Sequence, residues 1–149
     1  MKVKVKVPAT SANLGPGFDV AGLALTLYNT FTFELNEGGL NITGCPTQFC
    51  NEENLTYQAF SQAAQSCGLD FKGVNIHCES QVPYTRGLGS SSTCIVAGIV
   101  GAFAFKDKTD DRQEILELAT KIEGHPDNVA PAIFGGLTVS VMEKEQVRT

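Results

Sequence analysis

One stretch of the chain has the residue types of an anion-binding loop. Residues 83–93 read Pro-Tyr-Thr-Arg-Gly-Leu-Gly-Ser-Ser-Ser-Thr and lead into a run of small and apolar residues. Gly87 and Gly89 permit backbone conformations closed to other residues, so successive N–H groups can converge on an anion at the start of a helix. The serine hydroxyls can bind phosphate oxygens or join the shell of a magnesium ion. Taken alone, the stretch fits a glycine turn with a serine helix cap equally well.

Two familiar phosphate motifs do not match this stretch. A Walker loop requires Gly-Lys before Ser or Thr, but no lysine adjoins Gly89. A dinucleotide fingerprint requires a third glycine, and here Ser92 stands in its place. Its ribose-binding acid should end a second strand, whereas the nearest acids fall in a polar turn between two predicted helices at Asp107, Asp110 and Asp111. Both motifs are therefore poor fits to this stretch.

A second stretch, residues 8–19, combines polar side chains with a tight turn. Gly15-Pro16-Gly17 separates Asn13 from Asp19 and would hold both in defined directions, as a site for a small polar substrate requires. A carboxylate at this point could pair with an ammonium group. Seen in isolation, Asn and Asp in such a turn more often satisfy turn backbone.

A third stretch, residues 123–131, crowds polar side chains between two prolines. His125, Asp127 and Asn128 lie within this short turn and suggest a shaped polar surface. Their simpler roles would be a helix cap and a surface histidine. Glu117 lies eight residues before His125 on a predicted helix that would carry it toward the same end. By spacing alone, Glu117 is an ordinary solvated carboxylate.

The elements that must position these stretches follow from hydrophobic periodicity. Val3, Val5 and Val7 alternate with lysines, as in a half-buried strand. Similar patterns predict strands over 20–35, 40–43 and 74–80, and helices over 54–67, 93–105 and 112–122. Strands followed by helices that pack on one face indicate a two-layer α+β domain.

Composition limits the classes of protein that this chain can represent. Its 149 residues, 42% of them hydrophobic, suit one compact domain. A net charge of −5 gives no general attraction to nucleic acid or to an anionic membrane. No apolar run approaches the roughly 20 residues that span a bilayer. Five scattered cysteines without C-x-x-C spacing are typical of free thiols in a reducing cytosol, so we expect a cytoplasmic protein.

The three stretches together resemble the GHMP kinase superfamily and, within it, the homoserine kinases. Residues 83–92 are similar to the superfamily's phosphate motif, Pro-x-x-x-Gly-Leu-Gly-Ser-Ser. Residues 8–19 and 123–136 are closer to the homoserine kinases, because sugar and mevalonate kinases usually show a different first motif. The resemblance extends over nearly the whole chain.

This resemblance implies a particular architecture. Residues 1–149 are expected to form the N-terminal, ATP-binding GHMP kinase domain, an α+β fold of the ribosomal protein S5 domain 2-like type. The family's C-terminal ferredoxin-like domain, with its glycine-rich third motif, is expected to be absent, since the family runs to about twice this length. The face that would meet this second domain is expected to be apolar. Exposed apolar faces favour association, so a homodimer is one possible state.

The implied reaction is transfer of the γ-phosphate of ATP to the hydroxyl of L-homoserine, giving O-phospho-L-homoserine on the path to threonine. The positions expected to bind nucleotide are Asn54, Pro83, Arg86, Gly87, Leu88, Gly89, Ser90, Ser91 and Ser92. Mg²⁺ would be held by Ser91 and Glu117, with Glu123 as the alternative if the alignment has a gap. The positions expected to contact substrate are Asn13, Asp19, His125 and Asn128.

Within this set, Asn128 and Glu117 are the expected catalytic residues. Asp19 would pair with the substrate ammonium, and Asn128 would lie near the hydroxyl. Because mevalonate kinases carry an aspartate at the matching place and an asparagine cannot accept the proton in that way, Asn128 is expected to orient the hydroxyl. Phosphoryl transfer through a loose transition state needs little help from a base.

Two other functions remain open at this stage. The chain could be another small-molecule GHMP kinase, such as a mevalonate-type enzyme. It could also be a noncatalytic nucleotide-binding fragment, because residues that bind the substrate carboxylate in homoserine kinases come from the second domain.

Overall fold

The computed structural model describes residues 1–12, 21–83, 87–143 and 146–149. Its strands are β1 (Lys2–Ala12), β2 (Ala21–Asn36), β3 (Leu40–Thr43), β4 (Gly73–Ser80), β5 (Leu137–Val139), β6 (Val141–Glu143) and β7 (Gln146–Arg148). Its helices are α1 (Leu55–Cys67), α2 (Ser90–Ala104), α3 (Arg112–Glu123) and α4 (Val129–Phe134), with a 3-10 turn at Thr47–Phe49.

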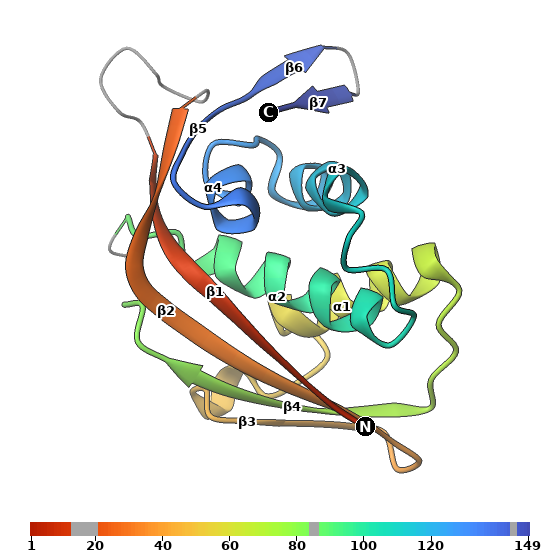
Figure 1. Ribbon diagram of the computed structural model, residues 1–149. Helices are drawn as coiled ribbons and strands as arrows, with labels where there is room; N and C mark the ends of the chain where they lie inside the picture. The colour runs from red at the N-terminus through yellow and green to blue at the C-terminus, as the bar shows by residue number, and fades with distance from the viewer. Residues whose placement is uncertain (13–20, 84–86, 144–145) are drawn as a thin grey trace.

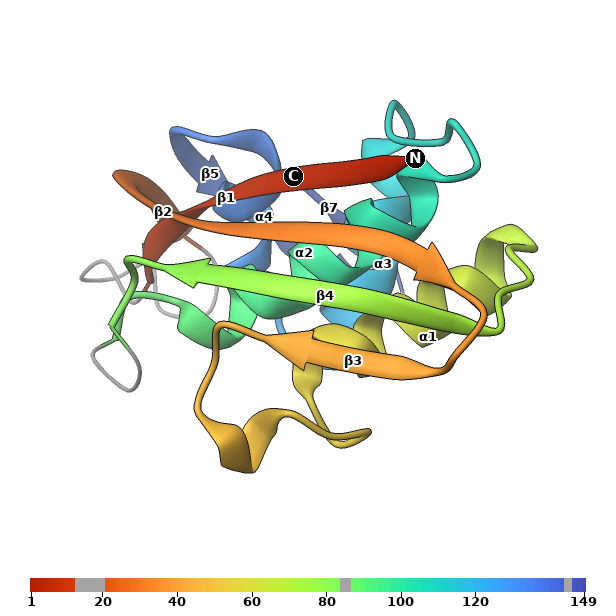
Figure 2. The same ribbon diagram turned by 90° about the horizontal axis from the view of Figure 1, so that it is seen from below.

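The main sheet has the strand order β1-β2-β4-β3, and β5 pairs with the N-terminal end of β2 at residues 21–23. All of these pairings are antiparallel except that of β3 with β4. The four helices lie on one side of this curved sheet (Figure 1). In the view from below, strands β1, β2, β4 and β3 lie in front and the helices lie behind them (Figure 2). The predicted two-layer α+β fold is confirmed.

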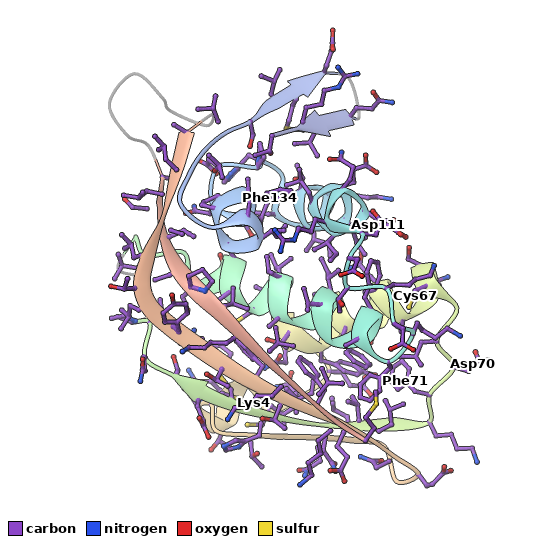
Figure 3. All side chains as sticks on the ribbon, in the orientation of Figure 1. Lys4, Cys67, Asp70, Phe71, Asp111 and Phe134 are labelled. Atoms are coloured by element: carbon purple, nitrogen blue, oxygen red, sulfur yellow. The ribbon has the colours of Figure 1, made fainter. Side chains whose placement is uncertain are left out.

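The period-two pattern of the strands builds the inner face of the sheet. One row of paired residues runs across all four strands, through Val3, Phe33, Ile76 and Ile42. Phe33 is fully buried and stacks on Phe60 of α1, with ring centroids 5.4 Å apart. Side chains fill the space between sheet and helices, as Figure 3 shows. The hydrophobic layer therefore fixes α1 and α2 against β2.

The structure extends two predicted elements toward the polar stretches. Strand β1 continues through Ala12, because it resumes pairing with β2 after an irregularity between Pro8 and Thr10. Helix α2 begins at Ser90, three residues before the predicted start at Thr93, so the serines form its first turn. None of the helices in the described ranges combines the length and the apolar character that a membrane crossing requires.

Candidate functional site

Two glycines in the left-handed conformation shape the turn before α2. Gly87 and Gly89 each have φ of +69°, a value that favours glycine. A Cβ atom on Gly89 would also collide with Oγ1 of Thr10, so the turn fits only a residue without a side chain. The N-cap residue of α2 is Gly89, which has no side chain to accept a hydrogen bond, and the first N–H groups of a helix have no intrahelical acceptors. These amides are therefore available to an anion.

The side chain of Asn29 on β2 holds this turn in place. Its Oδ1 accepts hydrogen bonds from the backbone N–H groups of Gln81 and Val82, at 2.8 and 2.9 Å. Its Nδ2 donates to Oγ1 of Thr93 at 3.0 Å, and that hydroxyl donates to the carbonyl of Ser90 at 2.7 Å. Asn29 is 1% exposed. One buried amide thus connects both sides of the loop, residues 81–82 and the first turn of α2.

Sequence reasoning missed Asn29, although a signal was present. Asn29 shares the inward face of β2 with Phe31 and Phe33, where a polar residue must find hydrogen-bond partners. An uncharged polar side chain in line with buried aromatics could have been recognised as a structural connector.

Thr10 connects the loop to Asn128. The backbone N–H of Thr10 donates to the carbonyl of Leu88 at 3.0 Å, and its Oγ1 donates to Oδ1 of Asn128 at 2.8 Å. Because the carbonyl oxygen of the Asn128 amide accepts from Thr10, its Nδ2 group remains as the donor of this side chain. Asn128 can therefore offer a hydrogen bond to an oxygen of a bound molecule.

Glu123 is the carboxylate that the structure brings to the serines. Its Oε1 accepts hydrogen bonds from the hydroxyls of Ser91 and Ser92, at 3.3 and 3.4 Å. Burial raises the pKa of the Glu123 carboxyl above its ordinary value, while the nearby His125 and the two hydroxyls oppose that shift. A half-buried carboxylate with hydroxyl neighbours is a suitable place for a divalent cation.

The prediction that Glu117 joins Ser91 is not supported by the geometry. Glu117 is exposed on α3 and its carboxylate accepts a hydrogen bond from Gln113, at 2.9 Å. Gln113 in turn donates to the carbonyl of Val147, on the side of α3 that faces β7. Six residues are about 1.7 helical turns, so Glu117 and Glu123 lie on different faces of α3. The alternative position, Glu123, is the one beside the serines.

Asp127 and His125 form a pair next to Asn128. Asp127 is 2% exposed, and its carboxylate contacts Nδ1 of His125, whose side chain is partly exposed. A Cβ atom on Gly22 would collide with the carbonyl oxygen of Asp127, so β2 packs directly against this turn. Asp127 thereby fixes the ring of His125 and leaves Nε2 as the nitrogen that can contact a ligand.

A cavity of about 570 Å³ opens beside the start of α2. Its polar wall comes from residues 87–91 and Asn128, and its apolar wall comes from the sheet, from α1 and from the segment that precedes α1. The apolar residues that line it are Ala12, Phe31, Ile42, Phe49, Leu55 and Ile76. The volume lies in the range of about 300–1,000 Å³ that is usual for small-molecule sites.

The remaining predicted positions differ in their relation to this cavity. Asn54 lines it, but its side chain caps α1 by accepting from the N–H of Tyr57 and donates to the carbonyl of Phe49. Ser92 is buried with its hydroxyl on Glu123, and Pro83 is exposed. Three predicted positions lie outside the described residues, namely Asn13, Asp19 and Arg86.

The donor set around Glu123 suits a metal that is completed by a ligand. In the part of the chain that the structure describes, no three His, Cys, Asp or Glu side chains gather as metal ligands. Magnesium commonly uses one or two carboxylates, waters and substrate phosphates. Glu123 and the Ser91 hydroxyl fit that pattern, whereas they would not form a cage for a metal without a phosphate.

The family is shown by the match of residues 54–136 to the GHMP kinases N terminal domain. The chain therefore belongs to the GHMP kinases. Curated proteins that are similar to this chain are named homoserine kinase. Those from Clostridium botulinum (strain Eklund 17B / Type B) and Clostridium beijerinckii are each 50% identical over 97% of this chain. The chain spans about half the length of these relatives, 49% in both cases.

Solved structures give a consistent result. A Listeria monocytogenes structure described as a homoserine kinase superposes with a TM-score of 0.86 at 35% identity, covering 99% of this chain and 52% of that chain. The Methanococcus jannaschii mevalonate kinase superposes with a TM-score of 0.76 over 100% of this chain and 56% of that chain. At 15% identity, the second likeness shows the fold alone.

Replacing Asn29 should loosen the loop. Asn29→Ala leaves the N–H groups of Gln81 and Val82 and the Thr93 hydroxyl without this partner, which we expect to cost about 1–3 kcal/mol of unfolding free energy. Hydrogen exchange should become faster at residues 87–93. Asn36→Ala is the matched control, because Asn36 also makes side-chain hydrogen bonds on β2, to Gly38, Gly39 and Asn75. Equal exchange at residues 87–93 in both variants would contradict the connector role.

The carboxylate of Glu123 should make stability depend on pH. A raised pKa means that the folded protein binds this proton more tightly than the unfolded chain, so the contribution favours folding below the unfolded pKa and is lost as pH rises through the folded pKa. With a chelator present, Glu123→Gln should therefore raise the unfolding free energy at about pH 7 and have less effect at about pH 4. Denaturant titrations would measure both.

Glu117→Gln serves as the control for that experiment, because the Glu117 carboxylate is exposed. Its unfolding free energy should stay close to that of the parent at both pH values. A loss of stability in Glu123→Gln at neutral pH would contradict the burial argument.

Proposed function

We propose that this cavity binds ATP, with the phosphates at the start of α2 and the base against the apolar wall. The observation that carries the proposal is the junction, in one cavity, of the uncapped glycine and serine turn with Phe49, Leu55 and Ile42. Backbone N–H groups at a helix start hold phosphate through hydrogen bonds and partial positive charge. An acidic protein can therefore hold a nucleotide without a cluster of lysines.

Magnesium would be held by Glu123 and the Ser91 hydroxyl. When bound, it supplies positive charge to the phosphate oxygens during transfer. The Ser92 hydroxyl, which is buried against Glu123, would keep the carboxylate oriented. This assignment replaces Glu117, whose carboxylate faces away with Gln113.

We infer that the whole protein phosphorylates the hydroxyl of L-homoserine. The inference is supported by curated relatives named homoserine kinase at 50% identity over 97% of this chain. Because those relatives are about twice as long, residues outside this chain would complete the substrate site. Asp19 and Asn13 remain the predicted contacts to the amino-acid part of the substrate.

Asn128 would orient the acceptor hydroxyl. With Oδ1 engaged by Thr10, its Nδ2 can donate to the hydroxyl oxygen and direct a lone pair at the γ-phosphate. His125, which is fixed by Asp127, would offer Nε2 to another polar group of the substrate. Both residues lie in the turn that follows α3, so one short segment would position the acceptor.

The proton of the hydroxyl does not require a strong base. An amide is not basic enough to remove it, and Asp127 is directed to His125. In a loose transition state the hydroxyl becomes acidic only as the new P–O bond forms, so the proton can leave late to a phosphoryl oxygen. Catalysis would then come from alignment and from the charge around the phosphate.

Nucleotide binding tests the first part of this proposal. Titration calorimetry should detect Mg-ATP binding, and Glu123→Gln should weaken it by about tenfold or more, the equivalent of one charge-assisted contact of about 1.5–3 kcal/mol. The same variant should change binding of ATP in excess chelator much less. Glu117→Gln should bind Mg-ATP as the parent does. A larger loss in Glu117→Gln than in Glu123→Gln would overturn the assignment.

The acceptor is tested with the complete gene product. Phosphorus NMR after incubation with Mg-ATP should show a phosphate ester with L-homoserine and little with mevalonate. Preferential phosphorylation of mevalonate would reject the homoserine kinase proposal in favour of a mevalonate-type enzyme. Binding of ATP without transfer to either alcohol would favour a nucleotide-binding protein that lacks this activity.

A further inference from the structure

The segment between β3 and α1 folds back on itself and carries two cysteines. Gly44 at its start has φ of +85°, and a Cβ atom there would collide with the backbone of Cys78, so the segment leaves β3 along a fixed path. The 3-10 turn Thr47–Phe49 then reverses the chain. Figure 2 shows this gold segment projecting beside β3. The reversal returns residue 50 to the neighbourhood of residue 45.

Hydrogen bonds hold this reversal in a single arrangement. The N–H of Phe49 donates to the carbonyl of Pro46 at 2.9 Å, and the N–H of Cys50 donates to that of Thr47 at 3.1 Å. The Asn54 side chain also donates to the carbonyl of Phe49, which attaches the turn to the start of α1. The backbone is thus ordered before any bond forms between the cysteines.

The two sulfur atoms are in contact. Sγ of Cys45 lies 3.3 Å from Sγ of Cys50, and Sγ of Cys50 lies 3.6 Å from the carbonyl oxygen of Cys45. Both residues are free thiols and both are partly exposed. A disulfide has a sulfur separation of about 2.05 Å, so the sulfurs need to approach by only about 1 Å. Both cysteines lie in the segment between β3 and α1, outside the strand and the helix.

We propose that Cys45 and Cys50 form a two-thiol site that a low-molecular-weight disulfide oxidises to an intramolecular disulfide. The oxidation of this pair is a different reaction from the proposed phosphoryl transfer. The pair borders the cavity, because Cys45 is one of the residues that line it.

The chemistry balances with glutathione disulfide as the oxidant. The thiolate of Cys50 attacks one sulfur of glutathione disulfide, which forms a mixed disulfide and releases one glutathione thiolate. Cys45 then loses its proton and attacks the Cys50 sulfur, which forms the Cys45–Cys50 bond and releases the second glutathione. The two protein thiols are oxidised, the one external disulfide is reduced, and the two protons pass to the glutathione thiolates. Burial raises the pKa of the Cys45 thiol, and the step balances equally if the two cysteines exchange these roles.

The other cysteines are poor competitors for this reaction. Burial raises the pKa of Cys78 to about 12, and burial also raises the pKa of Cys94. Their thiolates are scarce at neutral pH, and the thiolate is the reactive species. Cys67 is buried at the end of α1, at the position labelled in Figure 3, with its Sγ on the carbonyl of Ala64. The pair at 45 and 50 is therefore the expected site of oxidation.

Mass spectrometry of the protein tests this directly. After treatment with glutathione disulfide and denaturing alkylation with N-ethylmaleimide, alkylated thiols should fall from five to three, without retained glutathione. Peptide mapping should place the new bond between Cys45 and Cys50. Cys67→Ser, the control, should form the same bond and keep two alkylated thiols. Cys50→Ser should not form it.

Three results would overturn the two-thiol site. They are five alkylated thiols after oxidant, a persistent glutathione adduct on either cysteine, and a disulfide that includes Cys78 or Cys94.

A separate arm, which rests on the proposed nucleotide site, adds saturating Mg-ATP before the oxidant. Nucleotide bound in the cavity would cover Cys45 and should slow the oxidation several-fold. Normal closure without protection would count against the nucleotide site and leave the two-thiol site supported.

Discussion

The buried amide of Asn29 is the interaction on which the geometry of the candidate site depends. It joins β2, the strand at the centre of the hydrophobic layer, to the turn at residues 81–82 and to Thr93 in the first turn of α2. A second connection between the sheet and the glycine loop is the hydrogen bond from the N–H of Thr10 to the carbonyl of Leu88. These hydrogen bonds therefore fix the position of the backbone amides that we assign to phosphate binding. Amides bind an anion strongly only when their N–H groups are held pointing toward it.

The arrangement explains how a protein with a net charge of −5 can present an anion site. Attraction over a long range is absent, so the site has to act at hydrogen-bond distance. Left-handed glycines expose the amides, while Glu123 brings a negative charge close to the same place. A carboxylate beside bound phosphates is favourable only with a cation between them, which is why the nucleotide and the magnesium ion are proposed together.

Much of this structure could be predicted from the sequence, because periodicity and glycine chemistry are local. The alternation of Val3, Val5 and Val7 predicted β1, and the glycine and serine run predicted a turn before a buried helix. What sequence could not supply was long-range geometry. The choice between Glu117 and Glu123 depends on which face of α3 meets α2, and the partners of Asn29 are 52 to 64 residues away in the chain. The predicted roles of Asn13, Asp19 and Arg86 remain predictions, because these residues are outside the described ranges.

The most direct measurement is a crystal structure of the protein with magnesium and a nonhydrolysable ATP analogue. The account predicts that β- or γ-phosphate oxygens lie within about 2.7–3.2 Å of backbone nitrogens in residues 87–92. It also predicts that the metal contacts Glu123. Phosphates bound away from this turn, or held only by lysine and arginine side chains, would contradict the assignment of the helix start as the phosphate site.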